Sequence, residues 1–280
     1  MKISEIISAM STAIIPIVAK GTPESMIFAA GVQPLLSTAI DSILLDIFQK
    51  GVTKKETIRL GISYMSAVNQ VNENMKNNIP FRQDDMFVSS NMNYSDASDV
   101  IEATINSIML DSEHKKSEFY GYFIANLGFS PEVDYTNALY MQNIIKQLSF
   151  NQLCIIRYFQ SCAILDLSNC TKYIENSGDI KSMEIYFGIK ELIRLNLLKR
   201  HPPYTLGVDM QNHSLNVNGQ LICKMLSLHK IDIDSINAVD NIFKKRSLKK
   251  LKIISKYSRI LFSGQENTVP SGGLTIYSSG

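Results

Sequence analysis

The residues that could carry catalysis are few and lie far apart along the chain. His114 lies in the run DSEHKKSE beside Asp111 and Glu113, and a histidine next to carboxylates could serve as a general acid or base. The solvated face of a polar helix explains the same three residues. The chain contains no glycine-rich phosphate loop, no G-x-S-x-G elbow and no H-E-x-x-H helix. We therefore expect no catalytic residue, and a protein that is not an enzyme.

The residues that could bind a metal are also poorly arranged for it. The four cysteines lack the two-residue spacing of a zinc site, and they lie at Cys154, Cys162, Cys170 and Cys223. Asp84-Asp85 and the group Asp96, Asp99 and Glu102 could attract a cation, but acids also gather at helix N-termini. We expect no metal and no cofactor. Cys154 and Cys162 fit buried apolar positions in a reducing, cytoplasmic compartment.

Positive charge is concentrated near the end of the chain. The formal net charge is +2, yet residues 241–265 hold eight basic residues and no acidic one. These eight are Lys244, Lys245, Arg246, Lys249, Lys250, Lys252, Lys256 and Arg259. Apolar residues recur among them at near-helical intervals, and this spacing predicts a basic amphipathic helix over 229–262. Such a helix can pack on the acidic body of the chain, or contact anionic lipid or nucleic acid.

The N-terminal region is apolar enough to raise the question of a membrane. Residues 25–40 carry no charge, and the candidate membrane-contacting residues are Ile27, Phe28, Leu35, Leu36, Ile43 and Leu44. One interpretation is a buried helix that begins after Thr22-Pro23. The other is a membrane-active hairpin of residues 4–19 and 25–48, in which Asp41 and Asp46 would be costly. The sequence leaves both open, and a secretory signal is not expected.

The first half of the chain predicts an all-helical bundle. The run TKKE at 53–56 matches a capping box, and it opens a helix through about Asn77 with Ile58, Ile62, Met65, Val68 and Val71 in near-helical rhythm. A longer helix is expected from Ser95 to Leu127, with DSEHKKSE as its polar middle. A third covers about 134–147. An apolar share of 45% suits such a globular bundle and excludes overall disorder.

The second half predicts a winged-helix-like unit over 148–228. Ser149 and Gln152 form another capping box, a short second helix is expected in 166–178, and the strongest helix covers 182–198. An extended run broken by Pro202-Pro203 follows, then a strand through Leu215 and Val217 and a helix from about 218. This order of elements is typical of a winged helix.

A winged helix need not bind DNA, and the charges here favour another use. The outer face of helix 182–198 is mixed, with Lys181, Glu184, Lys190, Glu191 and Arg194. Acids are unfavourable against a phosphate backbone. Lys199 and Arg200 form a small basic patch just after this helix. We therefore expect a packing or protein-interaction module in preference to a DNA reader.

Three runs of this half, LSFNQLCIIRYF, IKELIRLNLLKR and LNVNGQLICKML, resemble the C-terminal half of the Abi-alpha family. The resemblance covers the helix that opens with Leu-Ser, the leucine-rich helix end and the strand that enters the last helix. Asn196 stands where the family pattern has glycine, and Asn216 or Asn218 where it has threonine. The resemblance implies a cytoplasmic or membrane-associated bacterial protein of abortive phage infection, without recognised catalytic residues.

Together these observations predict a mainly α protein in four parts: a helical bundle over 1–147, a winged-helix-like module over 148–228, a basic helix over 229–262 and a flexible tail over 263–280. The expected function is that of a non-catalytic interaction protein in bacterial anti-phage defence, with a protein partner or a second copy as ligand. A membrane-active effector on an anionic surface and a nucleic-acid-binding regulator are the alternatives.

Overall fold

The computed structural model describes residues 51–87, 95–161, 165–166, 180–201 and 212–241. Within these ranges the chain is mainly helical, as the sequence predicts. The predicted N-terminal apolar segment, the basic run 244–259 and the tail lie outside the described residues. No helix in the described ranges is long and apolar enough to cross a membrane.

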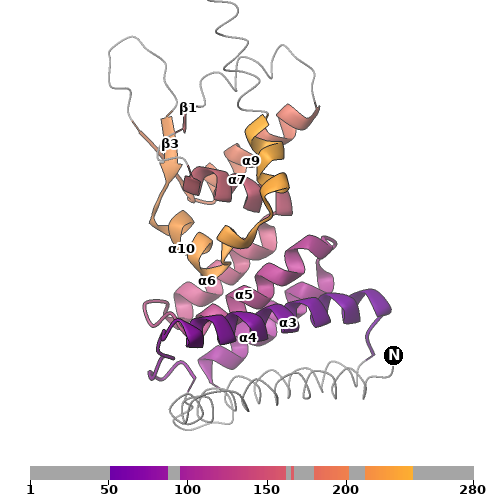
Figure 1. Ribbon diagram of the computed structural model, residues 1–280, viewed down its shortest axis with the longest axis vertical. Coiled ribbons are helices and arrows are strands. Elements are labelled where there is room, and N and C mark those ends of the chain that lie inside the picture. Colours follow the sequence, from indigo (N-terminus) through magenta and orange to yellow (C-terminus); the bar gives the residue numbers. More distant parts are fainter. Residues whose placement is uncertain (1–50, 88–94, 162–164, 167–179, 202–211, 242–280) are drawn as a thin grey trace, which may run out of the picture.

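The helices form two stacked groups (Figure 1). Helices α3 to α6 make a bundle in the lower half of the view, α7, α9 and a small sheet make the upper half, and α10 lies between them. The elements are α3 (Lys54–Lys76), α4 (Asp96–Leu110), η1 (His114–Lys116), α5 (Ser117–Leu127), α6 (Tyr135–Gln147), α7 (Phe150–Ser161), β1 (Leu165–Asp166), α9 (Ile180–Arg194), β2 (Leu198–Arg200), β3 (Asn212–Leu215), α10 (Val217–Met225), η2 (Leu228–Lys230) and a helix over 233–241.

Side-chain caps fix where the helices begin. Thr53 and Glu56 form the predicted capping box of α3. The second predicted box is also confirmed, because the Ser149 amide donates to Gln152 Oε1 at 2.7 Å and the Gln152 amide donates to Ser149 Oγ at 3.2 Å. Each box satisfies two backbone groups that the first turn of a helix leaves unpaired.

The polar run DSEHKKSE is a break between two helices, so the prediction of one helix from Ser95 to Leu127 is wrong there. Helix α4 ends at Leu110, and α5 begins at Ser117. Asp111 accepts a hydrogen bond from the Glu113 amide at 2.9 Å, which turns the backbone out of the helix.

Helix α3 buries a different face from the one its apolar rhythm suggests. Its buried residues include the polar side chains of Arg59, Ser63, Gln70 and Asn74 together with Leu60, Tyr64, Ala67 and Val71. Three of the apolar residues in that rhythm are exposed: Ile58 by 46%, Ile62 by 37% and Met65 by 44%. The buried polar groups have partners; Arg59, for example, donates from Nε to the Ile108 carbonyl at 2.9 Å. Hydrogen bonds of this kind allow a polar face to point inward.

The upper half contains a three-stranded antiparallel sheet in the order β1-β3-β2. Leu165 pairs with His213, and Leu198 pairs with Leu215. The strand β1 was not predicted. The order α7, β1, α9, β2, β3 is compatible with a winged helix, but its second helix would fall at 167–179, outside the described residues, so the winged helix stays a prediction.

Two boundaries in this half differ from the prediction. Helix α9 ends at Arg194 and not at 198, because Asn196 adopts a left-handed backbone with φ of 53° and β2 then begins. Ile193, near the end of α9, is 40% exposed. Val217 is the first residue of α10 and not part of the strand, since the Asn216 side chain caps the helix through the Gly219 amide.

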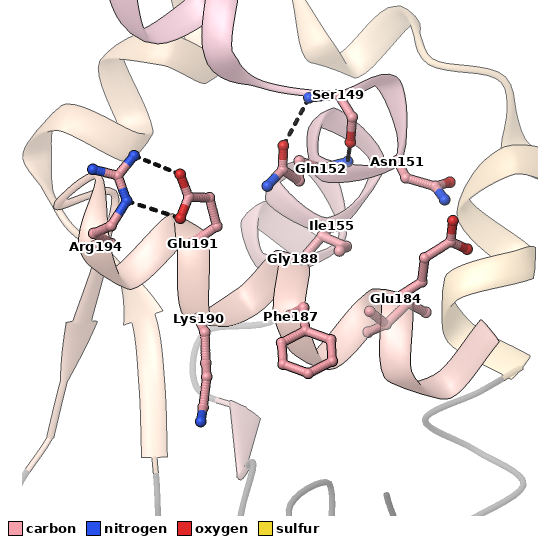
Figure 2. Close-up of a pocket in the computed structure, with 11 residues that line it drawn as sticks. Ser149, Asn151, Gln152, Ile155, Glu184, Phe187, Gly188, Lys190, Glu191 and Arg194 are labelled. Carbon is pink, nitrogen blue, oxygen red and sulfur yellow. Dashed lines mark hydrogen bonds and ion pairs between the residues drawn. The ribbon is translucent and has the colours of Figure 1, made fainter. Parts of the chain in front are cut away.

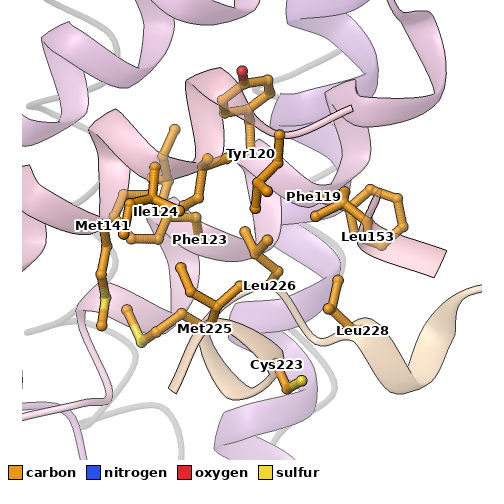
Figure 3. Close-up of a cluster of buried hydrophobic side chains, with 14 of the residues drawn as sticks. Phe119, Tyr120, Phe123, Ile124, Met141, Leu153, Cys223, Met225, Leu226 and Leu228 are labelled. Carbon is orange, nitrogen blue, oxygen red and sulfur yellow. The ribbon is translucent and has the colours of Figure 1, made fainter. Parts of the chain in front are cut away.

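One continuous apolar core joins the bundle to the upper half. Phe119 and Phe123 of α5 lie against Met225, Leu226 and Leu228 at the end of α10 (Figure 3). Buried Asn126 of α5 strengthens the junction, because its Nδ2 donates to the Met225 carbonyl at 2.9 Å and to Ser227 Oγ at 3.1 Å. The two halves are therefore held together by apolar packing and by hydrogen bonds.

Candidate partner-binding groove

A groove with a volume of about 580 Å³ lies between the first turns of α7 and the outer face of α9. We call it the α7–α9 groove. Figure 2 shows its walls, with Ser149, Asn151 and Gln152 contributed by α7 and the turn before it, and Glu184, Phe187 and Lys190 contributed by α9. Both helices belong to the segment 148–228, which the sequence predicts to be a winged-helix-like module.

The floor of the groove is apolar and lies where α7 and α9 approach each other closely. Ile155 and Ile185 are buried in the core on either side of Gly188. A Cβ at Gly188 would lie 3.0 Å from Ile155 Cδ1, so glycine keeps the floor open where the two helices meet. Phe187 stands beside this floor and is 56% exposed. An exposed aromatic side chain beside an apolar floor is a common anchor of protein interfaces.

Two of the three basic residues of α9 contact neighbouring side chains. Arg194 forms a bidentate pair with Glu191, in which Nη2 and Oε1 lie 2.5 Å apart, and Nη2 also donates to Gln147 of α6 at 3.2 Å. The hydrogen bond from Arg194 holds the pKa of Glu191 below its usual range. Lys190 Nζ lies 4.6 Å from the centre of the Tyr186 ring. The outer face of α9 thus carries charges of both signs, and its acids are unfavourable against a phosphate backbone.

The predicted basic patch lies outside the groove. Lys199 and Arg200 are exposed on β2, where they pair with Ser214 and His213 of β3. Within the described part of the chain neither forms an ion pair. The remaining predicted basic residues, 244–259, and the predicted membrane-contacting residues, 27–44, lie outside the described ranges.

The histidine–carboxylate cluster is built as a structural clamp. Asp111 accepts from Lys116 Nζ at 2.5 Å and from Tyr120 Oη at 2.9 Å, and Glu113 accepts from the Phe150 amide at 2.7 Å. Burial raises the pKa of Asp111, but the hydrogen bonds from Lys116, the Glu113 amide and Tyr120 together with the charge of Lys116 outweigh it, and the net direction is downward. His114 points to solvent. The carboxylates therefore fix the turn and cap α7, and they do not converge on an open site.

The other candidates for chemistry are likewise committed to structure. Cys154 and Cys223 are buried, and burial raises the pKa of each thiol to about 12, so neither is a reactive thiolate at neutral pH. Asp84 is neutralised by buried Arg82 at 2.6 Å. Asp99 accepts from Tyr135 Oη at 3.3 Å. No group of three or more potential metal ligands occurs among the described residues.

Sequence reasoning identified the mixed face of α9 but missed the groove. Glu184, Lys190, Glu191 and Arg194 were named as that face, and all four line the groove. Phe187 and Gly188 were not singled out. The pair Phe-Gly in the middle of an otherwise regular helix is the signal that could have identified them, since glycine is unfavourable inside a helix unless close packing requires it.

No protein-family model, curated protein or solved structure matches the chain.

Proposed function

We propose that the chain is a non-catalytic interaction protein that binds a protein partner, or a second copy of itself, through the α7–α9 groove. The observation that carries the proposal is Phe187, which stands 56% exposed beside an apolar floor and is flanked by acids and bases of both signs. This combination suits an amphipathic segment of a protein. The resemblance to the Abi-alpha family supports a cytoplasmic role in anti-phage defence.

Polar residues of the groove contact one another or neighbouring side chains, and these contacts support the non-catalytic part of the proposal. Glu191, Lys190 and Arg194 in the groove are paired with one another or with neighbouring side chains. The described groups whose pKa is shifted most are buried thiols and Tyr120, which sit in the core. A perturbed group in an open cleft is the usual sign of a catalytic site. Among the groove residues, the pKa of Glu191 is lowered and the pKa of Arg194 is raised, and each shift comes from the ion pair that the two side chains form with each other.

Site-specific photo-crosslinking tests the proposal in the full chain. A photoreactive amino acid replaces Phe187 in one variant and Tyr140, an equally polar-flanked exposed aromatic on α6, in the control. In bacterial cells exposed to phage, the variant at 187 is expected to form a discrete protein adduct or a covalent dimer, and the variant at 140 neither. An adduct with nucleic acid only, or equal adducts at both positions, would overturn the proposal.

A second arm tests whether binding matters for defence. Phe187→Ala removes the exposed anchor and is expected to weaken binding by about 30-fold, the usual loss for an aromatic hot spot. Cells that express this variant should lose the protection from phage that the unaltered chain confers, whereas cells with Tyr140→Ala should keep it. Protection that survives Phe187→Ala would contradict the role of the groove.

A further inference from the structure

The outer face of α3 carries a row of exposed apolar side chains on a helix that buries the polar side chains of Arg59, Ser63, Gln70 and Asn74. Ile58, Ile62 and Met65 are exposed by 46%, 37% and 44%, and half-buried Val68 continues the row by one turn. These four positions recur every three or four residues, so they lie along one side of the helix. We call them the α3 outer face. A row of exposed apolar side chains on one helix favours a further apolar partner.

We propose that residues 35–48 of this same chain form a helix that docks antiparallel on the α3 outer face. This proposal does not depend on the α7–α9 groove. The segment lies directly before α3 in the sequence, and its apolar residues Leu36, Ile40, Ile43, Leu44 and Ile47 recur at helical spacing. Asp41 and Asp46 fall off that apolar face.

The backbone between the segment and α3 is suited to a helix hairpin. Gly51 has a φ of 85°, the left-handed conformation that glycine adopts just beyond the end of many helices. Thr53 then caps α3 two residues later. Pro34 precedes the segment, and proline is favoured in the first turn of a helix. A short link of this kind joins two antiparallel helices.

The spacing along the two helices also agrees. In a hairpin centred on Gly51, Leu44 lies opposite Ile58, and Ile40 lies opposite Ile62. A helix over 35–48 is about 21 Å long, which matches the first four turns of α3, where the α3 outer face lies. The hairpin also places Asp46 near Lys55, which is exposed at the start of α3. Apolar contact and charge therefore select the same register.

The proposed docking has a consequence for the N-terminal segment. Leu36, Ile43 and Leu44 are among the residues that could otherwise contact a membrane. When the segment is docked on the α3 outer face, the same side chains are removed from water by contact with α3 and need no contact with lipid. Helix α3 thus becomes a central helix, with a mixed polar and apolar face toward the bundle and an apolar face toward the segment.

Disulfide trapping in the full chain tests the register. The four native cysteines are replaced by alanine, and Ile40→Cys is combined with Ile62→Cys or, as a control, with Tyr140→Cys on α6. Mild oxidation with diamide is expected to close an intrachain disulfide in the first pair only. The product would be a monomer without free thiols. A disulfide-linked dimer would assign the surface to a second copy and overturn the proposal, as would reduced thiols or equal trapping in both pairs.

Limited proteolysis gives an independent measurement with the native cysteines in place. The double variant Ile62→Glu and Met65→Glu places charge on the α3 outer face, and chymotrypsin cleavage within 35–48 is expected to become about tenfold faster. Tyr140→Glu should leave the rate unchanged. Equal cleavage rates in the double variant and the unaltered chain would overturn the proposal. So would protection of 35–48 that requires phosphatidylglycerol vesicles, because the segment would then bind lipid and not α3.

Discussion

Helices α3 and α9 both expose apolar side chains, but they differ in how many polar side chains they bury. Helix α3 buries Arg59, Gln70 and Asn74 and exposes Ile58 and Ile62. Helix α9 has an inner face of Ile185, Ile189 and Leu192, and its outer face combines charged residues with exposed Phe187 and Ile193. An inner face held by hydrogen bonds depends on exact backbone positions, whereas an apolar inner face tolerates small adjustments. The two helices should therefore respond differently to matched changes.

The largest expected difference in unfolding free energy comes from the glycine at which each helix meets its neighbour most closely. A Cβ at Gly121 of α5 would lie 2.1 Å from the carbonyl oxygen of Ser63 in α3, whereas a Cβ at Gly188 of α9 would lie 3.0 Å from a side-chain carbon of Ile155. The α3 backbone at Ser63 cannot move away from an added Cβ as readily as the terminal methyl group of Ile155 can. Gly121→Ala should lower the free energy of unfolding by about 3 kcal/mol, and Gly188→Ala should change it by less than about 1 kcal/mol.

Urea denaturation of both variants measures this contrast. Equal losses would show that the α3–α5 contact adjusts as readily as the α7–α9 contact, and the distinction between the two helices would fail. A stabilised Gly188→Ala variant remains compatible with it, because alanine favours a helix more than glycine does.

The sequence predicted those parts of the fold that depend on neighbouring residues. The capping boxes at Thr53 and Ser149 were read correctly because both partners lie within three positions. The mainly α character followed from helical periodicity in the same way. The mixed outer face of α9 was also predicted, since a charged face needs no knowledge of the partner helix.

The remaining features depend on contacts between residues far apart in the chain. Periodicity located the apolar row of α3, but Arg59 points inward because its acceptors, such as the Ile108 carbonyl, lie 49 residues away. Asn126 bonds the end of α10 across 99 residues. The α7–α9 groove exists only because Gly188 lets two helices meet. No local pattern reveals any of these approaches.

The ion pairs on the two sides of the molecule offer a second contrast. The side chains of Asp111 and Lys116 near α3 are 11% and 3% exposed, whereas those of Glu191 and Arg194 on α9 are 36% and 60% exposed. Asp111→Asn leaves the Lys116 ammonium buried without its partner, so the free energy of unfolding should fall by about 2 kcal/mol. Glu191→Gln should have no measurable effect, because exposed pairs contribute little.

The pH dependence of stability follows from the same pair. The pKa of Asp111 in the folded chain is below its ordinary value of 3.8, because the hydrogen bonds from Lys116, the Glu113 amide and Tyr120 and the charge of Lys116 together outweigh burial. The unfolded chain therefore takes up the proton first as the pH falls. The contribution of Asp111 is complete above about pH 5 and is lost progressively as the pH falls through the lower pKa of the folded chain. Urea midpoints at several pH values should show a shallower acid decline in Asp111→Asn, and an unchanged decline would contradict the role of the pair.

The outer faces of α3 and α9 give the smallest expected difference in unfolding free energy, and this difference tests whether residues 35–48 cover α3. If residues 35–48 cover α3, Ile62 is more buried in the whole chain than its 37% exposure implies, and Ile62→Ala should cost about 1 kcal/mol of unfolding free energy. Phe187→Ala on α9 should stay within about 0.5 kcal/mol, because its partner is another molecule and is absent from the measurement. A loss at Phe187 greater than the loss at Ile62 would mean that the groove on α9, and not the outer face of α3, is covered from within the chain.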